Sequence, residues 1–250
     1  MTIPVETGLC IASHNMCRGG RADAGNAWQR LMSDVGADIV CAQETRHPSL
    51  YLASDGGWPE PVHRLVPHGQ LGSAILSRRH SLTELPIADE YVGWVVGARV
   101  HGIYLGGRVQ DADVYSVHIP SPGPYERRVR QFLDVLGRAP SNCARIVAGD
   151  FTVTVALRQP AEELKNTEGE RLILQRFQDE LGLKNAWQAL HPGEPLPQTL
   201  RWSRNKVVRY HCDGIFVDSR CREHLRKAEV LSNESWTALS DHNPLVAVFE

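Results

Sequence analysis

The sequence predicts a mixed α/β or α+β fold in which two packed β-sheets form the core and helices flank them. Two patterns indicate this fold. Short apolar runs rich in β-branched residues recur along the chain, and segments of helical period lie between them. The connections in the middle of the chain are short and carry glycines at Gly93, Gly97 and 106–107. Such connections suit antiparallel hairpins better than the crossover units of a Rossmann-like sheet.

Eight apolar runs are expected to form strands, because each has the length and composition of a buried strand. In chain order they cover residues 9–13, 38–42, 72–76, 94–100, 114–117, 145–148, 214–217 and 245–249. Helical spacing predicts helices over 24–35, 125–136 and 161–181. The chain has no internal repeat and no low-complexity linker, so residues 1–250 are expected to form a single domain.

The charge balance limits the classes of partner. The chain has 27 Lys and Arg against 29 Asp and Glu, a net charge of −2, so it has neither a polybasic arm nor an acidic tail. A nucleic-acid substrate would therefore need a local basic surface. The stretches 127–130, 201–209 and 220–227 are candidates, although a solvated face is the commoner interpretation of any one of them.

Three features bear on the compartment. No stretch approaches the roughly 20 apolar residues of a membrane span, and the first residues have neither the basic nor the apolar region of a secretion signal. The six cysteines show no CxxC spacing, which argues against a zinc ribbon and for reduced thiols. We expect a cytoplasmic protein with no membrane association and no obligate protein partner.

Residues that can bind a metal or move a proton follow four of the predicted strands. Asn15 follows the first run, Glu44 the second, His118 the fifth and Asp150 the sixth. A single residue of this kind often marks only the exit of a strand from the core. Four such residues favour a site, because converging strand ends are where layered α/β proteins build sites. An acid before the seventh run and an adjacent acid and imidazole before the last add to the pattern.

This ordered set of motifs resembles the endonuclease/exonuclease/phosphatase superfamily. Its members include abasic-site endonucleases, pancreatic-type deoxyribonucleases, inositol polyphosphate 5-phosphatases and neutral sphingomyelinases. The resemblance runs from Cys10 to Phe249. Its motifs lie at residues 14–15, 37–45, 72–78, 116–120, 149–152, 181–187, 199–201, 211–216 and 240–242.

The resemblance implies a four-layer α/β sandwich with a metal-dependent phosphoesterase site at one end. A hard cation held by carboxylates can take up the negative charge that gathers on the phosphate oxygens during hydrolysis. Glu44 is the expected first metal ligand, and Asn15 and Asp241 are expected to complete or orient the metal sphere. Oxygen donors favour Mg²⁺, with Mn²⁺ able to replace it.

The resemblance also implies the catalytic groups. Asp150 is the expected base or water-orienting group, and His242, held by Asp213, is expected to contact a phosphoryl oxygen. His118 is expected to act as an acid or a phosphate ligand. Thr152 stands where the family signature usually has Asn, and its single hydroxyl is expected to hold the attacking water or the phosphate less well.

Three function classes stay open. The first is a nuclease or DNA-repair phosphodiesterase, for which Tyr210 and Arg201 are the expected substrate-binding residues. The second is a phosphatase of a small phosphorylated metabolite or a lipid headgroup, which the near-neutral charge permits and His118 suits. The third is a family member with weakened catalysis that serves as a binding module, and Thr152 is its support.

Overall fold

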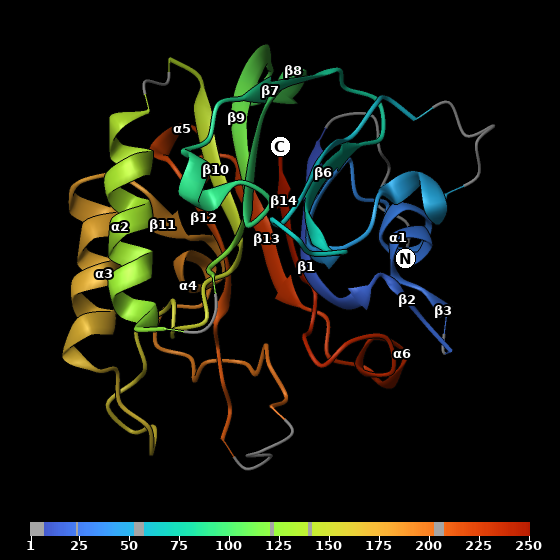
Figure 1. Ribbon diagram of the computed structural model, residues 1–250. Helices are drawn as coiled ribbons and strands as arrows, with labels where there is room; N and C mark the ends of the chain where they lie inside the picture. The colour runs from blue at the N-terminus through green and yellow to red at the C-terminus, as the bar shows by residue number, and fades with distance from the viewer. Residues whose placement is uncertain (1–7, 24, 53–57, 121–122, 140–141, 203–207) are drawn as a thin grey trace.

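Two six-stranded β-sheets pack face to face, and helices cover the outer face of each (Figure 1). The computed structural model describes residues 8–23, 25–52, 58–120, 123–139, 142–202 and 208–250. In order, the first sheet contains β13 (Leu225–Val230), β14 (Leu245–Phe249), β1 (Leu9–Gly19), β4 (Ile39–Thr45), β6 (Gly72–Ser77) and β5 (Val62–Leu65). The second contains β11 (Lys184–Asn185), β12 (Asp213–Val217), β10 (Ala144–Asp150), β9 (Arg108–His118), β8 (Val95–Leu105) and β7 (Leu82–Leu85). The predicted sandwich is confirmed.

Helices form the outer layers. Beside the second sheet lie α2 (Tyr125–Arg138) and α3 (Glu168–Asp179), and beside the first lie α1 (Ala27–Gln29) and α6 (Glu234–Thr237) (Figure 1). The smaller elements are a π-helical turn η1 (Arg30–Asp34), two 3-10 turns η2 (Pro48–Leu50) and η4 (Asp89–Tyr91), the helices α4 (Ala186–Leu190) and α5 (Ser219–Arg222), and the β2 (Arg21–Ala22) and β3 (Gly25–Asn26) pair. No helix among the described residues is long and apolar enough to cross a membrane.

Three buried apolar clusters fill the spaces between the four layers. The central cluster lies between the sheets and includes Ile11 from one sheet and Ile146 from the other. A second cluster lies beneath α2 and α3, where Phe177 stacks on Phe216 with ring centroids 3.9 Å apart. The third, around Trp28, packs beneath α1 and α6. Burying one such large apolar side chain contributes about 1.5–3 kcal/mol, so these clusters fix the sheets against each other.

The helix predicted over 161–181 is wrong in its first part. The structure begins α3 at Glu168, because Thr167 and Glu170 form a capping box. The Thr167 hydroxyl accepts a hydrogen bond from the backbone of Glu170 at 3.0 Å, and the Glu170 carboxylate accepts one from the backbone of Thr167 at 3.0 Å. This reciprocal pair satisfies backbone donors at the helix start and sets its position.

Strand direction positions the site. β1 runs parallel to β4, and β9 runs parallel to β10, so the carboxyl ends of the two strands in each pair lie along the same edge of their sheet. The two edges lie together, because Asn15 at the end of the regular pairing of β1 donates a hydrogen bond to Asp150 at the end of β10. Polar strand ends from both sheets therefore meet at one rim.

Candidate active site

A row of three side chains across the second sheet forms the base of the site. In the parallel register of β9 and β10, His118 pairs with Asp150, and in the antiparallel register of β10 and β12, Asp150 pairs with Asp213. Paired residues on neighbouring strands point to the same face. The register therefore places an imidazole and two carboxylates side by side.

The first sheet contributes Asn15 and Glu44 through irregular strand ends. The pairing of β4 shifts between Ala42 and Thr45, and Glu44 in this bulge has a φ of 50°. A bulge re-aims the side chain at a strand end. Here the Asn15 amide donates to the Glu44 carboxylate at 3.2 Å and to the Asp150 carboxylate at 3.0 Å. Asn15 therefore joins one carboxylate from each sheet.

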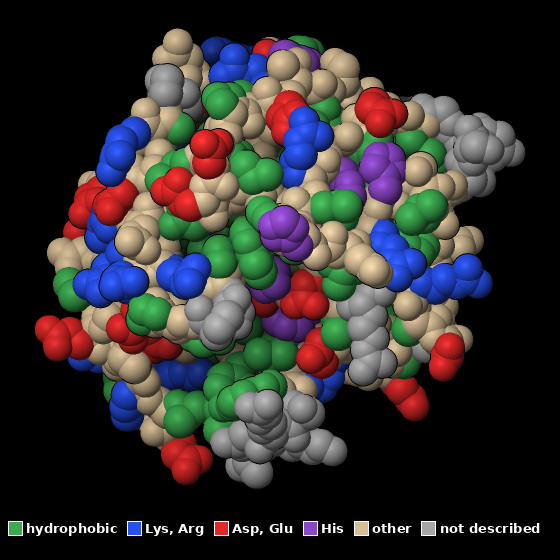
Figure 2. Space-filling model, viewed as in Figure 1, with side chains coloured by type: hydrophobic (Ala, Val, Ile, Leu, Met, Phe, Trp, Pro, Cys, Tyr) green, Lys and Arg blue, Asp and Glu red, His purple; other side chains and the backbone are tan. Residues whose placement is uncertain are grey.

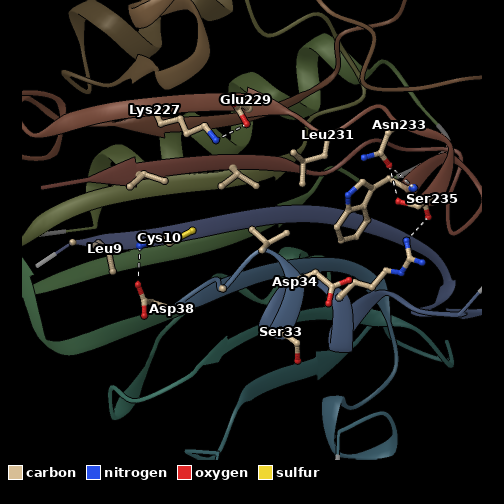
Figure 3. A pocket seen from close by; sticks show the side chains of 17 residues that line it. Leu9, Cys10, Ser33, Asp34, Asp38, Lys227, Glu229, Leu231, Asn233 and Ser235 are labelled. Carbon is tan, nitrogen blue, oxygen red and sulfur yellow. Dashed lines mark hydrogen bonds and ion pairs between the residues drawn. The ribbon is translucent and has the colours of Figure 1, made fainter. Parts of the chain in front are cut away.

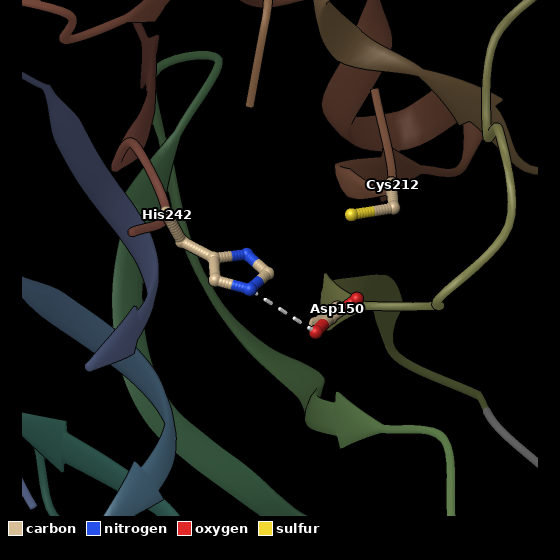
Figure 4. Close-up of side chains that lie close together, drawn as sticks. All are labelled: Asp150, Cys212 and His242. Carbon is tan, nitrogen blue, oxygen red and sulfur yellow. Dashed lines mark ion pairs between the residues drawn. The ribbon is translucent and has the colours of Figure 1, made fainter. Parts of the chain in front are cut away.

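A buried chain of charged groups runs from Asp213 through His242 to Asp150. The Nδ1 atom of His242 lies 2.9 Å from Oδ2 of Asp213, and its Nε2 atom lies 3.7 Å from Oδ2 of Asp150. Figure 4 shows the His242 ring directed at the Asp150 carboxylate. Burial disfavours the imidazolium, yet Asp213 and Asp150 outweigh it and raise the pKa of His242 to about 10. His242 is therefore protonated at neutral pH.

Asp150 is held in its ionised form. Burial opposes ionisation, but the neighbouring His242 and His118 outweigh it, so the pKa of Asp150 is lowered from its ordinary value. The Nε2 atom of His118 lies 3.9 Å from Oδ2 of Asp150 and 3.7 Å from Oε1 of Glu44. His118 thus stands between the two carboxylates.

Thr152 turns the chain directly after Asp150. Its φ is 58°, in the left-handed region, and its backbone N–H donates to Oδ1 of Asp150 at 2.8 Å. Its hydroxyl donates to the carbonyl of Phe151 at 2.6 Å. A β-branched residue rarely adopts a left-handed conformation. Thr152 therefore orients Asp150 through its backbone, at a cost in strain.

A cavity of about 540 Å³ opens beside these groups. Asp150, Thr152 and Cys212 form part of its wall, and Tyr210 and Trp202 form another part. The two aromatic rings meet edge to face, with centroids 5.8 Å apart. On the face drawn in Figure 2, histidine and acidic side chains gather near the centre, next to a group of hydrophobic side chains. The volume of the cavity lies in the usual range for small-molecule pockets.

Another cavity, of about 390 Å³, lies on the outer face of the first sheet and shares no residue with the candidate catalytic group, which consists of Asn15, Glu44, His118, Asp150, Asp213 and His242 (Figure 3). Charged side chains in the wall of this cavity bind neighbouring groups. The Nζ atom of Lys227 lies 2.8 Å from Oε2 of Glu229, and the Arg30 guanidinium donates a hydrogen bond to the carbonyl of Ser235 at 2.9 Å.

The family model of the endonuclease/exonuclease/phosphatase family matches residues 12–242. The chain belongs to this family. It is accordingly a hydrolase of phosphoester bonds, and enzymes of this family depend on a divalent metal. Among curated proteins, none matches the chain in sequence.

Solved structures with the same fold include three nucleic-acid enzymes. An AP endonuclease from Archaeoglobus fulgidus is 21% identical with a TM-score of 0.70, and the match covers 97% of this chain and 99% of that one. The AP endonuclease LMAP from Leishmania major is 16% identical with a TM-score of 0.75, over 99% and 89% of the two chains. The 3′ phosphatase NExo from Neisseria, bound to a product DNA hairpin, is 20% identical with a TM-score of 0.70, over 97% and 99%. At these identities the likeness shows the fold.

Arg201 and Asp241, two of the predicted site residues, lie beside the candidate catalytic group and make other contacts. The Arg201 guanidinium donates to the carbonyl of Ser240 and to the side-chain oxygen of Asn243, and its backbone N–H donates to the carbonyl of Asp241 at 2.8 Å. These bonds brace the loop that carries His242. The Asp241 side chain is exposed and adds to the rise in the pKa of His242. Substrate binding by Arg201 and metal binding by Asp241 stay predictions.

The structure brings together eight of the predicted residues, and three others that were not predicted join them. The eight are Asn15, Glu44, His118, Asp150, Thr152, Tyr210, Asp213 and His242. The three are Trp94, whose ring centroid lies 5.3 Å from that of His118, and Trp202 and Cys212 in the cavity wall. The adjacency of Cys212 to Asp213 is the one signal in the sequence that could have found any of them. Arg204 and Lys206 of the second basic stretch lie outside the described residues.

Proposed function

We propose that the protein is a divalent-metal-dependent phosphodiesterase that hydrolyses nucleic acid, most simply DNA in a repair reaction. The observation that carries this proposal is the cavity beside Asp150, which joins the catalytic group to the aromatic pair Trp202 and Tyr210. Aromatic side chains stack on bases and sugars of unpaired nucleotides. A nucleotide could rest its base or sugar on these rings while its phosphate lies against Asp150 and His242.

The donor set suits Mg²⁺ or Mn²⁺. The Glu44 carboxylate is 35% exposed, so it can reach both solvent and the buried group, and it sits beside an amide and a second carboxylate. Glu44 would hold the cation, with Asn15 and Asp241 completing or orienting its sphere. A bound cation of this kind would neutralise charge on the phosphate oxygens and the leaving oxygen.

The chain's own residues supply the remaining steps. Asp150 is ionised and fixed by the Thr152 N–H and the Asn15 amide, so it can orient the attacking water and accept its proton. His242 carries a positive charge that Asp213 maintains through Nδ1, so its Nε2–H can stabilise a phosphate oxygen. His118, between Glu44 and Asp150, can contact a second phosphate oxygen.

The relatives support nucleic acid as the substrate class. Two of the three structures described above are AP endonucleases, and the third is a 3′ phosphatase bound to a product DNA hairpin. A phosphatase of a small phosphorylated metabolite or a lipid headgroup is the second candidate, favoured by the position of His118 beside both carboxylates. The left-handed Thr152 is the observation that favours a catalytically weakened member.

A substrate panel tests the proposal. Wild-type protein and Asp150→Asn would be assayed on plasmid DNA, a duplex with an abasic site, an oligonucleotide with a 3′-phosphate, RNA, and a set of phosphorylated metabolites. We expect the wild type to cleave at least one DNA substrate in Mg²⁺, to lose that activity in EDTA, and to regain it with Mg²⁺ or Mn²⁺. The Asp150→Asn variant controls for contaminating nucleases. Hydrolysis of metabolites alone would refute the proposal in favour of the phosphatase, and full activity in EDTA would refute the metal dependence.

A further inference from the structure

One cluster in the site combines three ligand types that a hard cation does not prefer together. A carboxylate oxygen of Asp150, the Sγ atom of Cys212 and a ring nitrogen of His242 all lie within 4.8 Å of one another. It is the one cluster of this composition and spacing among the described residues. Figure 4 shows the thiol directed toward the space between the other two side chains. Thiolate and imidazole are the ligands that Zn²⁺ prefers.

We propose that Asp150, Cys212 and His242 form an inhibitory binding site for a thiophilic divalent cation, of which Zn²⁺ is the commonest. The site differs in its donor atoms from the oxygen-donor position at Glu44, to which the Asn15 amide links Asp150. Inhibition rests on the proposed function, because the cation would occupy the two groups that orient water and contact the phosphate.

The spacing suits a tetrahedral ion. With Zn–N and Zn–O bonds of about 2.0–2.1 Å and a Zn–S bond of about 2.3 Å, ligand atoms around tetrahedral zinc lie roughly 3.3–3.6 Å apart. The Nε2 atom of His242 already lies 3.7 Å from Oδ2 of Asp150. The Cys212 thiol, which donates a hydrogen bond to Oδ2 of Asp213 at 3.6 Å, would turn from Asp213 toward the ion to complete the set.

The surroundings of His242 resemble the second layer of a zinc site. Asp213 accepts a hydrogen bond from Nδ1 of His242, which leaves Nε2 directed toward Asp150. Histidine ligands of metals are commonly fixed in this way, with a carboxylate on the other ring nitrogen. Asp150 and Cys212 also line the 540 Å³ cavity, so a fourth position can be filled from that side by water or a phosphate oxygen.

Binding at the cluster must displace two protons, so the affinity should rise with pH. Burial raises the pKa of the Cys212 thiol well above its ordinary value, so the thiol is protonated before the ion enters. On binding, the thiol proton and the Nε2 proton of His242 would pass to solvent, and the two positive charges of the ion would replace the imidazolium charge and balance the new thiolate. The net charge of this buried group would therefore stay the same.

Cobalt substitution tests the site without requiring turnover. The purified full chain in excess Mg²⁺ would be titrated with Co²⁺, and we expect one equivalent to give a thiolate-to-Co²⁺ charge-transfer band that added Zn²⁺ removes. The Cys212→Ser and Cys212→Ala variants should lose the band and bind Zn²⁺ about tenfold or more weakly. Cys143→Ser, which changes a cysteine outside the cluster, should keep both properties. No band in the wild type would overturn the proposal even if both Cys212 variants failed to fold, and a band that survives in a folded Cys212 variant would also overturn it.

Inhibition is measured separately. Zn²⁺ should inhibit the Mg²⁺-supported phosphoesterase activity of the wild type, and Cys212→Ser should need about tenfold more Zn²⁺ for the same fractional loss of its own activity. Equal sensitivity of the two proteins would overturn the inhibitory role. If the wild type hydrolyses no nucleic acid, the proposed function fails, whereas the cobalt band still decides whether the site exists.

Discussion

Replacing Thr152 with Asn should relieve a local conflict between residue type and backbone. Thr152 has a φ of 58°, and this left-handed conformation costs an ordinary L-residue roughly 1–2 kcal/mol, whereas Asn adopts it more readily than most residues. The substitution also removes the hydroxyl donor to Phe151, a bond worth about 0.5–1.5 kcal/mol. The backbone bond from residue 152 to Asp150 does not depend on the side chain.

Thr152→Ala provides the matched control, because Ala and Asn both lose the hydroxyl bond. The two variants therefore differ mainly in their preference for the left-handed conformation, and Asn should be more stable by about 1 kcal/mol. For a chain of this length, that difference corresponds to ~2–4 °C in the melting temperature, measured by calorimetry. If Thr152→Asn melts no higher than Thr152→Ala, the strain argument is wrong.

The same Asn variant reports on catalysis. An Asn amide can donate as well as accept a hydrogen bond near Asp150, and one donor aimed at developing charge can contribute ~3 kcal/mol to a transition state. We expect Thr152→Asn to cleave DNA faster than the wild type. A fall in activity on a small phosphoester, with DNA cleavage negligible in both proteins, would instead indicate that Thr152 shapes the site for that smaller substrate.

Four further results are expected. Glu44→Ala should weaken Mg²⁺ binding, measured by titration calorimetry, and raise the Mg²⁺ concentration needed for activity; unchanged Mg²⁺ dependence would contradict its role as a ligand. Asp150→Asn and His242→Ala should each lower kcat by orders of magnitude, and the double variant should be scarcely worse, because groups that act on one transition state give non-additive losses. Additive losses would show that the two residues act independently. Arg201→Ala should lower kcat with little change in KM if Arg201 acts by bracing the loop of His242, whereas a rise in KM alone would indicate substrate contact. The contribution of His14 to stability should fall by about 1 kcal/mol between pH 6.5 and 5.5, because burial and the nearby His242 lower the pKa of His14 to about 3 and the unfolded chain takes up a proton that the folded chain does not. The difference in the free energy of unfolding between the wild type and His14→Asn should change by this amount over that pH range.

The sequence predicted every interior strand and missed every edge strand of the two large sheets. The eight apolar runs became β1, β4, β6, β8, β9, β10, β12 and β14, which have neighbours on both sides. The strands at the four edges, β5, β7, β11 and β13, each contain exposed positions and lack a continuous apolar run. An edge strand packs one face at most and is commonly polar. Burial therefore leaves its pattern in the sequence, and edge pairing does not.

The residues of the candidate site also divide into those that the sequence could predict and those that it could not. Residues at the ends of interior strands, such as Asn15 and Asp150, could be found from their place after an apolar run. Trp202 could not, and Cys212 only through its place beside Asp213, because the roles of both depend on how the segments 200–202 and 208–212 fold back over the end of β10. No local period encodes such a return, and only the tertiary structure brings these side chains to Asp150.

The order of strands along the chain has a consequence for how the enzyme could be divided. The second sheet is built entirely from residues between Leu82 and Val217, and the first from the segments before and after that stretch, whose ends are joined by the pairing of Leu9 with Phe249. The candidate catalytic group is shared equally: Asn15, Glu44 and His242 come from the outer segments, and His118, Asp150 and Asp213 come from the inner one. A chain circularly permuted at residues 78–81 would carry each sheet as one uninterrupted half. Neither half alone would hold a complete site, so hydrolysis by two co-expressed fragments would report their reassembly directly.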